Sequence, residues 1–185
     1  MWAVVGLGNP GREYSGTRHN AGADFVRRLA KAWDVRLKKK RFQAKVVEVD
    51  HAGERLWLVL PQTYMNGSGA TVRDLLRETR LEPERVVLVY DDLDIPLGQI
   101  RIRPSGTAGS HKGLQSVTQE TGSTRFPRIR IGIGPLPDGQ DAADFVLSAF
   151  EPGEKPLYEE SLALAREALE MILAGEISRA MNAYN

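Results

Sequence analysis

Residues 5–22 read VGLGNPGREYSGTRHNAG, and this stretch decides how the beginning of the chain folds. The apolar run WAVVG at 2–6 leads into it and is typical of a buried β-strand. GLGNPG at 6–11 then matches the spacing G-x-G-x-x-G, which in dinucleotide-binding proteins joins a strand to a helix and cradles a phosphate. The first question is therefore whether this loop binds a nucleotide cofactor.

The residues after the glycine motif argue against a dinucleotide. In that fold the helix begins within the glycine turn, so that its first N–H groups meet the pyrophosphate. Here Pro10 removes one of those donors, and apolar helical spacing resumes only near Phe25. No acidic residue ends a second strand at the required distance, since Asp24 falls inside the predicted helix. We therefore expect no cofactor, and dinucleotide binding stays only as an alternative that a cofactor titration excludes.

Strands and helices alternate along the rest of the chain. Short β-branched or alternating runs predict strands at 2–6, 42–50, 55–61, 86–90, 99–103 and 128–134. The short turn HAGE predicts that the second and third of these form an antiparallel hairpin. Helical spacing predicts helices at about 20–33, 69–79 and 156–174, the first with Asn20 as its N-cap. This mixture predicts one α/β domain over residues 1–185, with a twisted, mixed and centrally parallel sheet flanked by helices.

Composition excludes several classes of protein. The chain has 185 residues and no cysteine, which leaves no disulfide, thiol nucleophile or thiolate metal site. Its histidines His19, His51 and His111 are far apart in sequence, so we expect no zinc site and no other metal. No apolar run approaches the ~20 residues of a membrane span, and no secretory signal is evident. A cytoplasmic location without membrane attachment is expected.

Charge is distributed unevenly along the chain. Residues 1–137 hold 22 Lys and Arg against 14 Asp and Glu, whereas residues 138–185 hold 3 against 10. The basic part is compatible with a polyanionic partner such as nucleic acid. An ordinary mixed surface with an acidic C-terminal helix accounts for the counts equally well. Within the basic part, the run Lys38 to Arg41 is interpreted as a solvated loop, and His51 is assigned no role.

Polar side chains follow the predicted ends of several strands. Asn9, Tyr14 and His19 come after the first strand, and Asn66 follows the third. Further along lie the acidic group of Asp91, Asp92 and Asp94 and the glycine-rich loop with His111 and Lys112. Open α/β sheets bind ligands at the carboxyl ends of their strands, so these loops predict a site there. With no thiol and no G-x-S-x-G elbow, a set of His, Asp and Asn suits hydrolysis of an ester by activated water.

Five ordered blocks of sequence carry a resemblance to a known family. The blocks are VGLGNPGREYSGTRHNAG, LVLPQTYMNGSG, VYDDLDIPLGQIRIR, GSHKGL and FPRIRIGIG, and in this order and spacing the chain resembles bacterial peptidyl-tRNA hydrolase over essentially its whole length. The resemblance implies hydrolysis of the ester between a peptide and the tRNA 3′-ribose. It also implies a monomeric enzyme that needs no metal and whose partner is peptidyl-tRNA, bound at its acceptor stem and 3′ end.

The resemblance also implies roles for individual residues. His19 in TRHNAG matches the catalytic base, and Asp91 matches the carboxylate that orients it. Asn9 in GNPG matches the residue that helps to separate blocked from unblocked aminoacyl-tRNA. Met65 and Asn66 match positions that line the peptide and the tRNA 3′ end.

The remaining matches concern tRNA binding. Tyr14 and Tyr64 match tRNA-binding positions, and Arg103 and Arg130 align with basic residues proposed to hold the 5′-phosphate of the acceptor stem. His111 lies in the GSHKGL block and is counted with the substrate-binding residues. One departure follows it: the commoner family pattern is H-N-G-L, whereas this chain has His111-Lys112-Gly113-Leu114. Lys112 is therefore expected to contact tRNA rather than to order the catalytic water.

A second function remains open from the sequence. The plastid intron-splicing relatives of this family show that such a chain can instead be a non-catalytic RNA-binding scaffold. Because His19, Asp91, Asn9 and Asn66 are all present, the enzyme is the favoured hypothesis.

Overall fold

The computed structural model describes residues 1–185, and its central feature is a sheet in the strand order β2-β3-β4-β1-β5-β7-β6. The strands β4, β1, β5 and β7 run parallel, while β3 and β6 are antiparallel to their neighbours. This confirms the predicted mixed, centrally parallel α/β sheet. The strands are β1 (Trp2–Gly6), β2 (Lys39–Arg41), β3 (Ala44–His51), β4 (Glu54–Pro61), β5 (Val86–Pro96), β6 (Ile100–Arg103) and β7 (Arg128–Gly134).

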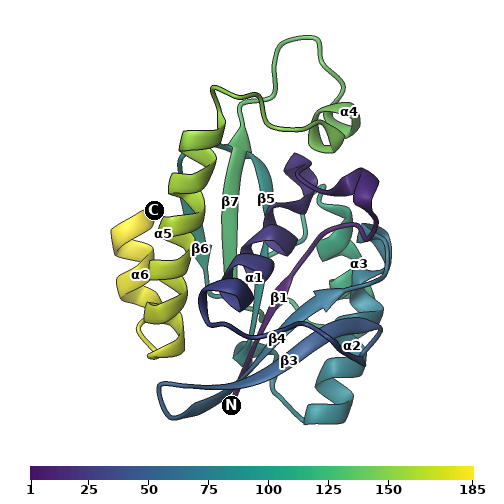
Figure 1. Ribbon diagram of the computed structural model, residues 1–185, viewed down its shortest axis with the longest axis vertical. Helices are drawn as coiled ribbons and strands as arrows, with labels where there is room; N and C mark the ends of the chain where they lie inside the picture. The colour runs from purple at the N-terminus through teal and green to yellow at the C-terminus, as the bar shows by residue number, and fades with distance from the viewer.

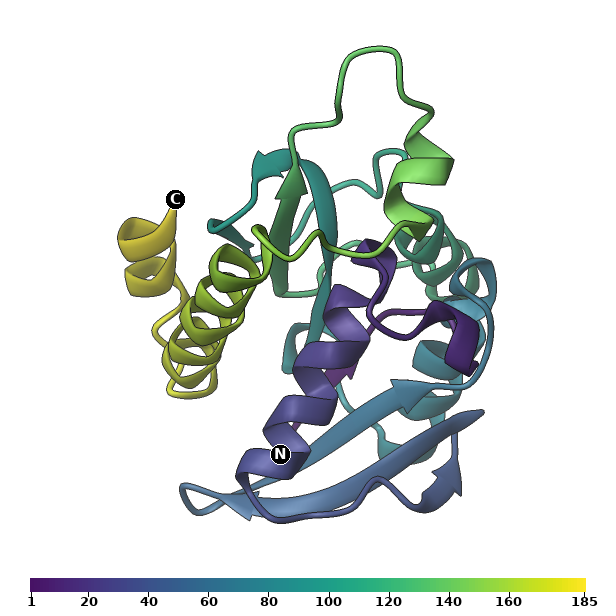
Figure 2. The same cartoon turned by 45° about the horizontal axis from the view of Figure 1, so that its top comes forward.

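Helices cover both faces of the sheet (Figure 1). One face packs against α1 (Ala21–Ala32), α5 (Lys155–Leu173) and α6 (Ile177–Tyr184), and the other against α2 (Ser68–Thr79) and α3 (Lys112–Thr121). The short helix α4 (Ala142–Leu147) stands beyond the end of the sheet, after a loop that projects from β7 (Figure 2). Four 3-10 turns complete the fold: η1 (Arg12–Tyr14), η2 (Arg18–Asn20), η3 (Met65–Gly67) and η4 (Pro83–Arg85).

The glycines of the first motif allow α1 to lie close against the sheet. A Cβ at Gly6 would lie 2.2 Å from the carbonyl oxygen of Gly22, and one at Gly22 would lie 2.1 Å from that of Val89. The motif is followed by η1 and η2, so no helix begins inside it. The glycines are thus used for close backbone approach, and no helix N-terminus is presented to a pyrophosphate.

Several local predictions were wrong. Asn20 occupies the N-cap position of α1 as predicted, but its side chain does not hydrogen-bond the helix, since it bonds the backbone of Asn9 instead. The run from Lys38 to Arg41 is not only loop, because Lys39–Arg41 form the edge strand β2. The helices α3, α4 and α6 were not predicted at all. The predicted strand at 86–90 continues to Pro96, which carries its acidic residues along the strand.

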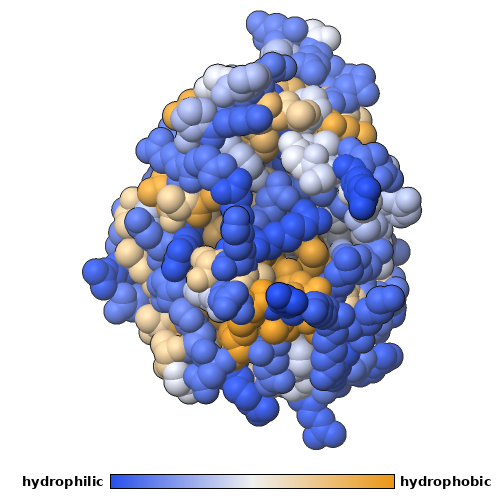
Figure 3. All heavy atoms as spheres, viewed as in Figure 1, coloured by the Kyte–Doolittle hydropathy of each residue, from blue (hydrophilic) through white to orange (hydrophobic).

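The surface is mainly polar, and the face in Figure 3 is dominated by hydrophilic residues with apolar ones gathered in small patches. Only Tyr64, Leu147 and Leu157 are large apolar or aromatic side chains with substantial exposure. None of the helices combines the length and the apolar character that crossing a bilayer requires.

Candidate active site

The predicted loops meet at the carboxyl end of the parallel strands, around a cavity of about 760 Å³. The cavity wall contains residues that follow β1 and β4 and residues within β5, together with the loop before α3 and one side of α4. Every site residue expected from the sequence lines it except Tyr14, whose ring packs edge-on against Tyr64 with centroids 6.2 Å apart. The lining members are Asn9, His19, Tyr64, Met65, Asn66, Asp91, Arg103, His111, Lys112 and Arg130.

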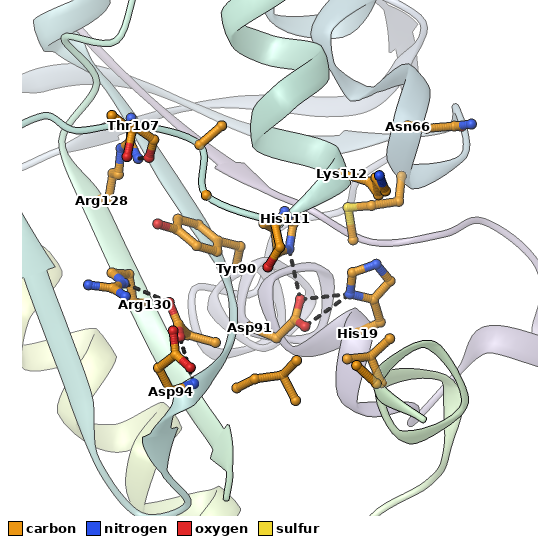
Figure 4. A pocket seen from close by; sticks show the side chains of 18 of the residues that line it. His19, Asn66, Tyr90, Asp91, Asp94, Thr107, His111, Lys112, Arg128 and Arg130 are labelled. Atoms are coloured by element: carbon orange, nitrogen blue, oxygen red, sulfur yellow. Dashed lines mark hydrogen bonds and ion pairs between the residues drawn. The ribbon is translucent and has the colours of Figure 1, made fainter. Parts of the chain in front are cut away.

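His19 and Asp91 form a hydrogen-bonded pair at the bottom of this cavity (Figure 4). Nδ1 of His19 lies 2.9 and 3.0 Å from the two carboxylate oxygens of Asp91. A carboxylate can only accept, so Nδ1 carries the proton and Nε2 is the basic nitrogen of the neutral ring. His19 lies in η2 and Asp91 lies in β5, and the two residues are 72 positions apart in sequence.

A second imidazole donates to the same carboxylate. Nε2 of His111 lies 3.1 Å from Oδ1 of Asp91, while its Nδ1 accepts from the backbone N–H of Leu114 at 3.3 Å. A backbone N–H can only donate, which leaves the proton of neutral His111 on Nε2, facing Asp91. His111 was expected to bind substrate, and no local pattern in the sequence pairs it with Asp91.

Asp91 is ionised in this environment. Its side chain is 2% exposed. Burial alone would raise the pKa of Asp91, but the electrostatic interaction with His111 and the hydrogen bonds from His111 and His19 together outweigh burial and hold this pKa well below its usual range. The carboxylate is therefore available to orient His19 and to stabilise its protonated form.

Asn9 is held in place by a residue that sequence reasoning had assigned elsewhere. The buried Asn20 accepts from the backbone N–H of Asn9 at 2.8 Å and donates to its carbonyl at 3.0 Å. The side-chain oxygen of Asn9 accepts from the backbone N–H of Met65 at 2.7 Å. That contact leaves the amide NH₂ of Asn9 as the group that can donate to a ligand.

Polar and cationic groups lie on the neighbouring walls. Asn66 is exposed in η3, and Lys112 is exposed in the first turn of α3. Figure 4 shows the second ring nitrogen of His19 facing toward the side on which Asn66 and Lys112 lie. Neither side chain caps its helix, since the N-cap of α2 is Gly67 and that of α3 is His111.

Arginines occupy the part of the sheet that α2 and α3 leave uncovered. Arg101 pairs in register with Arg130, and Arg103 with Arg128, so all four point to one face of β6 and β7. Nε of Arg130 donates to Asp92 at 2.7 Å. Arg128 is buried and donates to the carbonyls of Gly106 and Thr107, in the loop that leads to His111. Arg128 thus supports the site, a role for which the sequence offers no separate signal.

One further wall of the cavity is apolar. It consists of Leu93 from β5 and one side of α4, with Ala142, Ala143, Val146 and Leu147. Since α4 was not predicted, this wall was missed by sequence reasoning.

Spacing of the histidines in sequence is a poor guide to their spacing in space. The ligand atoms of His19, Asp91 and His111 lie within 4.8 Å of one another, which is the kind of set that can hold a divalent ion. Each of the two nitrogens facing Asp91 is, however, engaged in a hydrogen bond to it. The third histidine, His51, stacks on Trp33 and bonds to Glu170, outside the cavity.

Comparison with known proteins gives one consistent result. A family model described as peptidyl-tRNA hydrolase matches residues 3–185. The chain is similar to the peptidyl-tRNA hydrolase of Chloroflexus aggregans, with 45% identity over 100% of this chain and 99% of that protein. The one from Alkaliphilus metalliredigens is 42% identical, and the match covers 100% of both chains. The crystal structure of peptidyl-tRNA hydrolase from Acinetobacter baumannii superposes with a TM-score of 0.93 at 34% identity, over 100% of this chain and 96% of that one.

Proposed function

This chain belongs to the peptidyl-tRNA hydrolase family, and from that premise we propose how its residues perform the reaction. The enzyme hydrolyses the ester that joins a peptide to the 3′-ribose of tRNA, and releases both. The observation that carries the assignment of residues is a buried carboxylate holding His19 at the bottom of a large, open cavity. A hydrolase needs a base there, and His19 is the group with a free basic nitrogen.

In the proposed reaction, Nε2 of His19 takes a proton from a water molecule as the water oxygen attacks the ester carbonyl carbon. Asp91 stabilises the resulting imidazolium through Nδ1–H. The tetrahedral intermediate then collapses, the bond from the carbonyl carbon to the ribose oxygen breaks, and that oxygen receives the proton from His19. The peptide leaves as a carboxylic acid, so no covalent enzyme intermediate and no metal is required.

Two amides bind the reacting group in this proposal. Asn9 donates through its NH₂ group to the peptide next to the ester, and this contact discriminates a blocked from an unblocked aminoacyl group. Asn66 and Met65 contact the peptide and the terminal nucleotide. Support comes from the hydrogen bond between Asn9 and the backbone of Met65, which holds these residues in one unit.

Cationic and aromatic residues bind the tRNA itself. Tyr14 and Tyr64 offer ring faces for stacking on bases, and Tyr64 is 59% exposed at the cavity. Arg103 and Arg130 bind the 5′-phosphate of the acceptor stem, and Lys112 contacts phosphate or terminal ribose near the 3′ end. Lys112 can only donate, so ordering of the attacking water falls to the asparagines.

The direct test is His19→Ala. We expect kcat for an N-blocked aminoacyl-tRNA to fall by roughly 10²–10⁴-fold, because general-base assistance is lost. Binding of the tRNA in a filter assay should change little. His51→Ala removes an imidazole outside the cavity and serves as the matched control, with near-normal turnover. Turnover of His19→Ala close to that of the parent would exclude the mechanism, and binding without any hydrolysis by the parent would favour the scaffold alternative.

We also infer that the enzyme acts as a monomer. Of the three large exposed apolar or aromatic side chains, Tyr64 and Leu147 line the cavity, and only Leu157 lies elsewhere. No extended apolar face is left for a second copy to cover. Sedimentation equilibrium should give the mass of one chain, and a dimer mass at micromolar concentration would contradict this inference.

A further inference from the structure

Arg18 is a buried charge that the reaction above does not use. It precedes His19 in η2, yet it does not line the cavity, and its side chain is 4% exposed. Its guanidinium carbon lies 4.3 Å from the ring centroid of Phe145 and 4.9 Å from that of Phe150. A desolvated cation between two aromatic faces is attracted by both rings.

The polar contacts of Arg18 lead to the same short segment. Nη2 donates to Glu154 at 2.6 Å, and Nε donates to the hydroxyl of Ser148 at 3.1 Å. The backbone N–H of Arg18 donates to the carbonyl of Ser148 at 3.0 Å, beside an antiparallel bridge between Thr17 and Ala149. Burial raises the pKa of Glu154, but the hydrogen bonds from Arg18 and from the backbone of Glu151, together with the charge of Arg18, outweigh burial and hold this pKa below its ordinary value.

That segment continues directly from the apolar wall of the cavity. Phe145 belongs to α4, whose residues Ala142, Ala143, Val146 and Leu147 form the wall. A six-residue helix is too short to be stable without tertiary contacts, so α4 depends on what holds it. Its contacts with η2 join it to the turn that carries His19. The guanidinium of Arg18 lies where the two meet.

We propose that Arg18 is a positioning residue, whose guanidinium joins the turn carrying His19 to α4 and so fixes the separation between the catalytic base and the apolar wall. This proposal rests on the proposed function, because it requires that one substrate contacts both the apolar wall and His19. Displacing a reacting group by about 1 Å can lower a rate by about 10²-fold. If Arg18 served stability alone, removing it from its pair with Glu154 would lower the free energy of unfolding but leave kcat and KM of the folded enzyme unchanged.

The first experiment compares Arg18→Met with Arg28→Met. Arg28 forms a bidentate pair with Glu159 between α1 and α5, on the surface and outside the cavity, and is the control for losing an arginine ion pair between two elements. For Arg18→Met we expect a fall of about 10²-fold in kcat/KM for peptidyl-tRNA, divided between a lower kcat and a higher KM. The control should keep kcat and KM near those of the parent. Thermal unfolding of both variants establishes that they are folded at the assay temperature.

The second experiment is chemical rescue. Arg18→Ala leaves a space between Phe145 and Phe150, and millimolar guanidinium chloride should restore part of the lost kcat/KM. Sodium chloride at the same ionic strength should not. Guanidinium bound in this space would also stabilise the folded state, so thermal unfolding is followed under the same conditions. Rescue of kcat/KM at a temperature where Arg18→Ala is already fully folded separates positioning from structural support, and no rescue there would contradict positioning.

Three results would overturn the proposal. The first is a folded Arg18→Met with kcat/KM within about twofold of the parent, since the expected effect is far larger. The second is an equal loss in Arg28→Met. If the Arg18 variants do not fold, Glu154→Gln keeps the shape of the partner and removes its charge, and normal kcat and KM in that variant would be the third. Failure of the proposed function is distinct, because it shows as unimpaired hydrolysis by His19→Ala with Arg18 intact.

Discussion

At the scale of single residues, two imidazoles share one carboxylate. His19 and His111 both donate to Asp91, which is buried on β5 and has no other side-chain partner. Asn20 and Arg128 play a comparable supporting part, since the amide of Asn20 and the two terminal nitrogens of Arg128 hydrogen-bond backbone groups of loops at the cavity. The side chains proposed to contact the substrate are therefore positioned by buried polar neighbours.

The variant Asp91→Asn tests the contact between His19 and Asp91 through its effect on activity. We expect kcat to fall by about 10²–10⁴-fold, because the amide no longer stabilises the imidazolium of His19. The acid limb of the pH profile of kcat/KM should move to lower pH for the same reason. Asp94→Asn, an exposed carboxylate on the same strand, is the control and should keep the parent profile. An unchanged profile in Asp91→Asn would remove Asp91 from its role.

The same carboxylate predicts how stability changes with pH. The pKa of Asp91 is lower in the folded protein than its ordinary value of 3.8, so ionised Asp91 stabilises the fold above that value. This contribution is lost as the pH falls toward the folded-state pKa. The difference in free energy of unfolding between the parent and Asp91→Asn, measured in urea at a series of pH values, should therefore shrink below about pH 4. A difference that grows on acidification would contradict the assignment.

At the scale of elements, α2 and α3 pack closely because a glycine lies where the two helices touch. A Cβ at Gly69 of α2 would lie 2.1 Å from the carbonyl oxygen of Ser116 in α3, and the N–H of Gly69 donates to the hydroxyl of Ser116 at 2.9 Å. The N-terminal turn of α3 holds His111, and η3, which holds Asn66, leads directly into α2. The distance between these two helices therefore sets the spacing of one wall of the cavity.

Gly69→Ala should separate these helices. We expect a loss of about 1–3 kcal/mol in the free energy of unfolding, because overpacking a backbone contact forces the helices apart. Gly153→Ala is the control, since no atom lies within 4 Å of a Cβ there. Urea unfolding of both variants measures the difference. Equal stability of the two variants would show that the crossing of α2 and α3 adjusts without strain.

At the scale of the whole molecule, two charged groups of the sequence lie on opposite faces of the sheet. The arginines of β6 and β7 point to the face of α2 and α3, while the acidic C-terminal part forms α5 and α6 on the opposite face. The basic face is continuous with the cavity through Arg103 and Arg130. This arrangement accounts for a chain of formal net charge +1 that nevertheless offers a cationic surface beside its site.

Salt dependence tests that surface. Affinity for tRNA should fall as salt rises, because phosphate contacts release counterions. Arg103→Gln and Arg130→Gln should each weaken binding and reduce the slope of log K against log salt by about 1. Lys31→Gln, in the last turn of α1 and outside the cavity, should leave the slope unchanged. A slope that is flat in the parent would contradict a role for these arginines in binding phosphate.

The sequence by itself determined the class of fold and the types of side chain that are available at the site. Hydrophobic periodicity is local, so it predicted α1, α2, α5 and the central strands, and short turns predicted the hairpin of β3 and β4. Polar residues at strand ends predicted the cavity, because parallel strands bring their carboxyl ends together. Short elements such as β2, α4 and α6 were missed because they form through tertiary contacts.

Only the tertiary structure decided which side chains support the site. His111 meets Asp91 across 20 positions, Asn20 meets Asn9 across 11, and Arg18 meets Glu154 across 136. In each of these pairs a buried polar group must find its partner in the folded chain or lose the hydrogen bonds that water would have supplied. That requirement acts on positions in space, so a linear pattern of residue types carries no trace of which partner satisfies it.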